Sequence, residues 1–128
     1  MTYITKEQAI EIYKSLIETT GGEYGINDDL LTLCLDIPSQ IYFGHEVHLT
    51  ILDKAAAYLY YFVTLHPFTD GNKRFGYVVT RIFLLVNGYD FNCSQEERYN
   101  FVMSIAQNQE TLESVKLWIK KFVDKRDL

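Results

Sequence analysis

The chain has 128 residues, of which 48% are hydrophobic and 23% are charged, a composition typical of a folded globular domain and not of a disordered segment. We therefore expect residues 1–128 to form a single domain with a single functional site. The formal net charge of −5 offers no broad positive surface, so direct binding to nucleic acid is not expected.

Several features predict a cytoplasmic protein that does not interact with a membrane. The first residues turn polar at once and lack the apolar core of a signal peptide. The most apolar stretches, residues 55–65 and 77–86, are each shorter than a bilayer-spanning helix. Cys34 and Cys93 form neither a CxxC pair nor a disulfide framework, so both are expected to be small buried hydrophobic residues.

The N-terminal part of the chain predicts two helices. Thr5 and Gln8 have the spacing of a capping box, and the apolar residues that follow repeat with a helical period until residues 21–22, which are both glycine. A second short helix is expected from Asp28. Pro38 ends it, because the residue before a proline disfavours helical backbone angles.

The middle of the chain predicts a hairpin followed by two central helices. Residues 40–49 contain two short β-prone runs around a glycine, which favours a small hairpin. Thr50 begins a helix that is apolar nearly all round over residues 55–65, as expected for a helix at the centre of a core. A second largely buried helix is predicted from Asn72 to a C-terminal stop at residues 87–88, Asn-Gly.

Two further helices are predicted near the C-terminus. Ser94 and Glu97 form another capping box, and Thr111 caps the last helix. The inward stripe of that last helix is expected to consist of Val115, Trp118, Ile119 and Phe122. The fold class predicted from these elements is all-α, a compact bundle of about six helices with a small β-hairpin.

One polar segment between the two central helices carries the residues suited to chemistry: His66-Pro67-Phe68-Thr69-Asp70-Gly71-Asn72-Lys73-Arg74-Phe75-Gly76. It lies where a helix begins and offers unpaired backbone N–H groups, which attract anions. Gly71 allows the backbone to approach a phosphate, and Arg74 can bind two phosphate oxygens. Asp70 can hold Mg²⁺ together with the phosphates of a substrate. His66 suits a general base, since imidazole titrates near neutral pH.

Plainer interpretations exist for the same residues. A histidine before a proline at a helix end is commonly a cap or a core residue, and residues 70–72, Asp-Gly-Asn, are also a good turn signal. Lys73 and Arg74 could be surface cations, although cations in a first turn oppose the helix dipole unless an anion is bound. Residues 45–48 contain two histidines and a glutamate, but these alternate faces of a strand and lack a fourth ligand, so no metal site is expected there.

The segment from His66 to Gly76 resembles the signature loop of the Fic/Doc family, HPFx(D/E)GN(G/K)R. The resemblance implies a Fic fold, with this loop between two central helices and a preceding hairpin, called the flap, at residues 39–49. It further implies that His66 deprotonates a target hydroxyl, that Phe68 is a buried anchor, and that Asp70 holds Mg²⁺. The phosphates of the nucleotide would be held by Gly71, Asn72, Lys73 and Arg74.

The layout up to residues 87–89, including the glycine-rich turn at residues 21–25, is similar to the short death-on-curing (Doc) branch of the family. Lys73 stands where adenylylating members have glycine, and Tyr77 stands where they have a second arginine. This implies a toxin that transfers the γ-phosphate of ATP to a hydroxyl of a target protein, with a translation elongation factor as the target. AMP transfer to a protein hydroxyl and an inactive binding module remain the alternatives.

The family also contains an inhibitory helix with the motif (S/T)xxxE(G/N). The nearest match, Thr19 with Glu23, is followed by Tyr24 and is not intact. The implied partner is therefore a separately encoded antitoxin.

Overall fold

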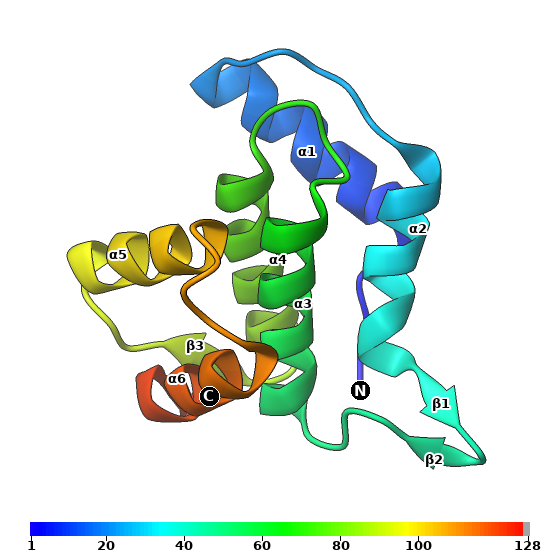
Figure 1. Cartoon of the computed structure of the whole chain (residues 1–128), viewed down its shortest axis with the longest axis vertical. Helices are drawn as coiled ribbons and strands as arrows, with labels where there is room; N and C mark the ends of the chain where they lie inside the picture. The colour runs from blue at the N-terminus through cyan, green and yellow to red at the C-terminus, as the bar shows by residue number, and fades with distance from the viewer. Residues whose placement is uncertain (127–128) are drawn as a thin grey trace.

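The computed structural model describes residues 1–126, which form six α-helices and two small antiparallel sheets (Figure 1). The helices are α1 (Lys6–Thr20), α2 (Asp28–Asp36), α3 (Ile51–Leu65), α4 (Asn72–Val86), α5 (Gln95–Ala106) and α6 (Leu112–Phe122), with a short 3₁₀ helix, η1 (Ile37–Ser39), after α2. The strands are β1 (Ile41–Tyr42), β2 (His45–Glu46), β3 (Tyr89–Phe91) and β4 (Val123–Lys125). The predicted helical bundle with a small hairpin is confirmed.

Most of the helices begin at a residue whose side chain accepts a hydrogen bond from a backbone N–H of the first turn: Thr5, Asn27, Thr50, Ser94 and Thr111. Such caps satisfy N–H groups that have no partner inside the helix. The capping boxes predicted at Thr5 and Ser94 are present, and Thr111 forms a third one with Ser114. Helix α4 is the exception, because no side chain of residues 1–126 caps its N-terminus.

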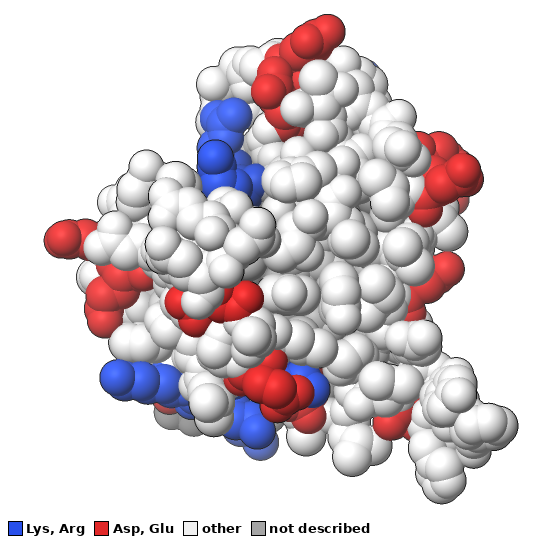
Figure 2. All heavy atoms as spheres, in the orientation of Figure 1, with Lys and Arg blue, Asp and Glu red and all other residues white. Residues whose placement is uncertain are grey.

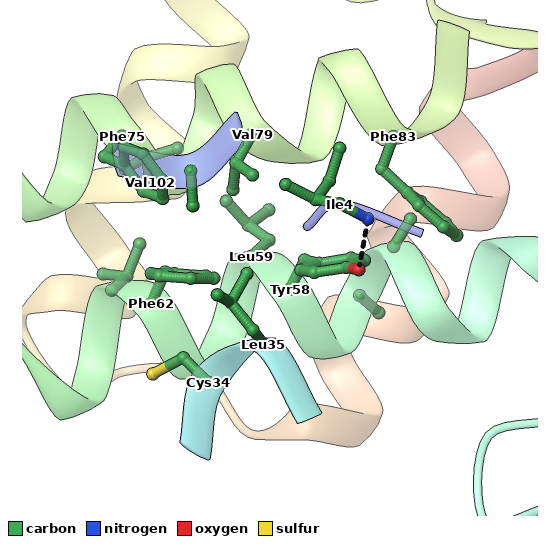
Figure 3. Packing of buried hydrophobic residues seen from close by; sticks show 14 of the residues in the cluster. Ile4, Cys34, Leu35, Tyr58, Leu59, Phe62, Phe75, Val79, Phe83 and Val102 are labelled. Atoms are coloured by element: carbon green, nitrogen blue, oxygen red, sulfur yellow. Dashed lines mark hydrogen bonds between the residues drawn. The ribbon is translucent and has the colours of Figure 1, made fainter. Parts of the chain in front are cut away.

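The core lies between α3 and α4, with α3 also contacting α2, α5 and α6. Figure 3 shows the side chains that face one another across this interface, namely Tyr58, Leu59 and Phe62 from α3 and Phe75, Val79 and Phe83 from α4. Gly76 allows the two helices to approach closely, since a Cβ atom there would lie 2.8 Å from Cγ2 of Val63. Each fully buried side chain of this size contributes about 1.5–3 kcal/mol, so this interface is a main source of stability.

The predicted hairpin forms through β1 and β2, joined by a two-residue turn at Phe43 and Gly44. Both turn residues have positive φ angles, 51° and 77°, as a type I′ turn requires. Lys54 of α3 connects the hairpin to the core. It is fully buried, and its Nζ donates to the Pro38 carbonyl over 3.2 Å and to the Glu46 carboxylate over 3.1 Å.

The hairpin lies at the N-terminal end of α3, whereas His66 follows its C-terminal end (Figure 1). A helix of this length separates its two ends by about 20 Å. The hairpin tip carries the exposed side chains of Tyr42 and Phe43 and no charged residue (Figure 2). The segment that the resemblance identifies as the flap is therefore present but remote from the signature loop.

The sequence did not reveal the second sheet, in which β3 pairs with β4 and Phe91 lies opposite Val123. Three-residue strands are too short to produce a recognisable alternating pattern. Arg81 of α4 binds Asp90 of β3, with Nε 3.1 Å from Oδ1 and Nη2 3.3 Å from Oδ2. The hydrogen bond from this guanidinium lowers the pKa of the Asp90 carboxyl. The sheet thereby attaches the C-terminal segment to the end of α4.

The two cysteines differ in their surroundings. Cys34 is fully buried, as predicted, and burial raises the pKa of its thiol to about 12. Cys93 is only half-buried, so the expectation of two buried cysteines is wrong for the second one. Within residues 1–126, no helix combines the length and the apolar character that crossing a bilayer requires.

Candidate active site

His66 ends α3 in the left-handed backbone region, with φ 52° and ψ 61°. Residues other than glycine reach this region at a cost of about 1–2 kcal/mol, and histidine is among the types that tolerate it. The side chain of His66 is exposed, and its imidazole makes no hydrogen bond with any other residue in the described part of the chain. In the neutral imidazole one ring nitrogen carries a proton, and the other is free to accept one from an incoming group.

Phe68 anchors the loop that follows His66. It is 4% exposed, and its ring stacks on Tyr13 of α1 with centroids 3.8 Å apart and planes 12° apart. It also packs edge-on against Phe75 of α4, with centroids 4.6 Å apart. The burial that the resemblance implied for Phe68 is thus found. The aromatic stack fixes the loop between the first helix and the two central ones.

The backbone of the loop is bound to the segment that precedes α2. The Asn27 N–H donates to the Pro67 carbonyl over 2.8 Å, and the Thr69 N–H donates to the Gly25 carbonyl over 2.9 Å. Gly25 is tightly packed, because a Cβ atom there would lie 2.1 Å from Oγ1 of Thr69. Two loops far apart in sequence therefore form one rigid unit.

The side chain of Asn72 closes the loop from the other side. Its Oδ1 accepts from the Phe68 N–H over 3.0 Å, and its Nδ2 donates to the Phe68 carbonyl over 2.8 Å. The amide is thus engaged with the protein's own backbone. Any contact between Asn72 and a phosphate would come from its backbone N–H.

Asp70 connects the loop to the turn after α1. Its Oδ2 accepts a hydrogen bond from the Glu23 N–H over 2.7 Å, while its carbonyl accepts one from the Tyr13 hydroxyl over 3.0 Å. Sequence reasoning missed Tyr13 and Glu23 as supports of the site. A tyrosine on an apolar helix face resembles an ordinary core residue, and a backbone donor leaves no signal in a sequence.

The start of α4 forms an open cradle. Gly71 precedes the helix with φ 87°, and a Cβ atom there would lie 3.3 Å from Cδ1 of Ile17, so both its conformation and its packing favour glycine. In the described part of the chain, no acceptor binds the backbone N–H groups of Asn72, Lys73 and Arg74. These groups border a cavity of about 490 Å³ lined by Thr20, Gly21, Gly22 and residues 69–74. Free N–H groups at a helix start favour an anion in this cavity.

Two cations border the cradle. Lys73 and Arg74 are exposed, and no carboxylate among residues 1–126 lies within 4 Å of either side chain. The Arg74 guanidinium lies 3.4 Å and 3.5 Å from the carbonyl oxygens of Thr20 and Gly21, at the negative end of α1. Figure 2 shows basic side chains grouped over the start of α4, beside α1.

The structure thus brings together most, but not all, of the residues that the sequence singled out. Asp70, Gly71, Asn72, Lys73 and Arg74 line one cavity. His66 precedes this group by four residues in the chain and is not among the residues that line the cavity. The imidazole therefore lies at the surface of the same rigid loop, outside the cradle itself.

Asp70 is the residue best placed to hold a metal ion at this site. Its second carboxylate oxygen makes no hydrogen bond with residues 1–126, and the side chain is exposed beside the cradle. No group of three or more histidine, cysteine or acidic side chains in the described residues forms a metal site. This arrangement fits Mg²⁺ that arrives with a nucleotide, which typically uses one or two protein carboxylates and the substrate phosphates.

The model of the Fic/DOC family matches residues 3–84, which include the loop, the cradle, all of α3, and α4 except its last two residues. The chain belongs to the Fic/DOC family. Members of this family generally transfer a nucleotide-derived group to a protein. No curated protein gives a significant match to the sequence. The family match ends before β3, α5 and α6, so these elements lie outside the matched residues.

Proposed function

We propose that this Fic/DOC protein is a Doc-like toxin that transfers the γ-phosphate of ATP to a hydroxyl side chain of a target protein. The observation that carries the proposal is the N-terminus of α4, which borders a cavity of about 490 Å³ and lacks a side-chain cap, together with Lys73 and Arg74, which have no acidic partner among residues 1–126. A polyphosphate is the ligand whose charge and shape match this cradle. The exposed imidazole of His66 on the same loop supplies a base.

The proposed reaction assigns a role to each residue of the loop. The target hydroxyl oxygen attacks the γ-phosphorus, the bond from that phosphorus to the bridging oxygen breaks, and ADP leaves. His66 accepts the hydroxyl proton. The free N–H groups of α4, with Lys73 and Arg74, stabilise the charge that spreads over the phosphate oxygens. Mg²⁺, held by Asp70 and by the phosphates, would neutralise part of that charge.

Phosphate transfer is favoured over AMP transfer by the residue at position 73. A lysine there brings bulk and a full charge into the cradle, where adenylylating members have glycine. Because phosphoryl transfer depends mainly on positioning, a shifted nucleotide changes which phosphorus faces the attacking oxygen. The similarity to Doc also motivates a translation elongation factor as the target and a separately encoded antitoxin as the partner.

A labelling experiment tests the reaction directly. The purified protein is incubated with Mg²⁺, cell extract and ATP that carries the label at either the α- or the γ-phosphate. We expect a protein of the extract to retain label only from γ-labelled ATP, and the labelled protein to be identified by mass spectrometry. Label retained only from α-labelled ATP would establish AMP transfer and overturn the proposal.

His66→Ala is the critical variant and His45→Ala is its matched control. Both remove an exposed histidine, but His45 lies on the hairpin at the opposite end of α3. We expect His66→Ala to abolish transfer and to relieve growth arrest in cells that express the protein, with unchanged helical circular dichroism. If neither label transfers and His66→Ala arrests growth as the wild type does, the protein acts as a binding module.

A further inference from the structure

A second cavity adjoins the cradle. It has a volume of about 530 Å³ and lies between α1, α4 and α5. Lys73 and Arg74 line both cavities, so the cradle and this groove lie side by side along α4. The groove walls are largely apolar, with Leu16, Val78 and Met103 among them. Its volume lies within the range of about 300–1,000 Å³ that is usual for small-molecule sites.

Arg98 of α5 is a third cation that lines this groove. Its Nη1 donates to the Tyr77 hydroxyl over 2.7 Å, and its guanidinium carbon lies 4.1 Å from the centre of the Tyr77 ring. Tyr77 follows Arg74 by three residues on α4, so both lie on one face of the helix. Arg98 therefore lies beside the position where adenylylating relatives would have their second arginine.

No carboxylate in residues 1–126 lies within 4 Å of the Arg98 guanidinium. Among residues 1–126, the basic side chains that do have an acidic partner are those of Lys6, Lys54, Arg81 and Lys116, none of which lines this groove. Three unpaired cations, Lys73, Arg74 and Arg98, thus border one groove. A groove with apolar walls and a cationic edge matches a nucleotide, whose base is flat and whose tail is anionic.

We propose that Arg98 is a nucleotide-binding residue, which holds the part of ATP that extends from the cradle into the groove between α4 and α5. This inference rests on the proposed function. With the γ-phosphate at the loop, the α-phosphate and the nucleoside extend along α4 past Arg74 and reach Arg98. Arg98 lies on α5, outside the residues that the family model matches, and it supplies a guanidinium beside position 77, where this chain has tyrosine.

Nucleotide titrations of the full chain test this role. Calorimetry with Mg·ATP and Mg·ADP is expected to show that Arg98→Gln weakens both by about 10- to 100-fold, as expected for a lost charged hydrogen bond. Arg98→Lys is expected to recover part of the affinity. Lys120→Gln is the control, because it removes an exposed cation of α6 that lines neither cavity.

Tyr77→Phe separates binding from a structural role. It removes the hydroxyl that Arg98 contacts but leaves the guanidinium in the groove, so nucleotide affinity should fall by less than it does in Arg98→Gln. Thermal unfolding of every variant identifies losses that arise from destabilisation.

Unchanged affinity of folded Arg98→Gln for both nucleotides would overturn the proposal. A loss confined to ATP would also overturn it, because Arg98 would then hold the γ-phosphate and not the α-phosphate. A wild-type chain that binds neither nucleotide would refute the proposed function itself, which is a distinct result.

Discussion

The amide of Asn72 offers the sharpest test of how the signature loop is built. Asn72→Ala removes both hydrogen bonds to the Phe68 backbone, at 3.0 Å and 2.8 Å, and leaves that N–H and carbonyl without their partner. If Asn72 served only to bind phosphate, the substitution would leave the folded state intact. Because the amide spans the loop, we expect it to destabilise the protein even without nucleotide.

The expected loss of stability follows from the N–H and the carbonyl of Phe68, which both lose their partner. Each buried polar group that loses its partner costs about 1–3 kcal/mol, and water can reach this half-buried site, so the low end of the range applies. The higher helix propensity of alanine offsets about 0.5 kcal/mol of this loss in the free energy of unfolding. The net loss is about 1.5 kcal/mol. For a domain of this length, with an unfolding entropy of about 0.27 kcal/mol/K, that lowers Tm by about 6 °C.

Circular dichroism at 222 nm, followed against temperature and against urea, measures this loss. Asn100→Ala is the matched control, because Asn100 is exposed on α5 and its side chain makes no hydrogen bond with the described residues. Its stability should change by no more than about 0.5 kcal/mol. An Asn72→Ala protein as stable as wild type would refute the reasoning, since the loop would then hold without its amide.

Three further predictions concern stability and reactivity. Burial lowers the pKa of His48 below its ordinary value of 6.5, so the folded state favours the neutral imidazole more than the unfolded state does. The resulting stabilisation is present above pH 6.5 and is lost as the pH falls. We expect the urea midpoint to fall as pH drops from about 7 towards 5, and His48→Gln to flatten this slope. Gly76→Ala should cost about 1–2 kcal/mol by crowding Val63, and Val63→Ala should relieve it in a double-mutant cycle; additive effects would contradict close packing. Iodoacetamide should modify native Cys93 well before Cys34, as mass spectrometry will show, because burial raises the pKa of Cys34 to about 12.

Much of the fold could be predicted because it depends on residues close together in the chain. Thr5 with Gln8 and Ser94 with Glu97 cap helices through contacts three residues apart. The absence of such a cap before Asn72 was equally readable, since Gly71 has no side chain to provide one. The structure leaves the N–H groups of that turn open, as the sequence led us to expect.

Sequence reasoning was less successful where a residue's surroundings come from distant segments. The hairpin was expected from its glycine and β-prone runs, and chain order alone places it before α3, but only the tertiary structure shows that buried Lys54 attaches it to the core. The inward stripe of α6 was predicted better, because a helical period is local: Val115 and Ile119 are buried, and the half-buried Trp118 packs against the core.

By itself the sequence determined six helices, the polar loop between the two central ones, and the residue types at that loop, because caps, helical periods and turns are local interactions. The tertiary structure decided what supports the loop and what adjoins it. The Glu23 N–H reaches Asp70 across 47 residues, the Tyr13 hydroxyl reaches it across 57, and Arg98 reaches Tyr77 across 21. No local pattern records such pairings, because only the packing of α1, α4 and α5 around a shared core brings those residues together.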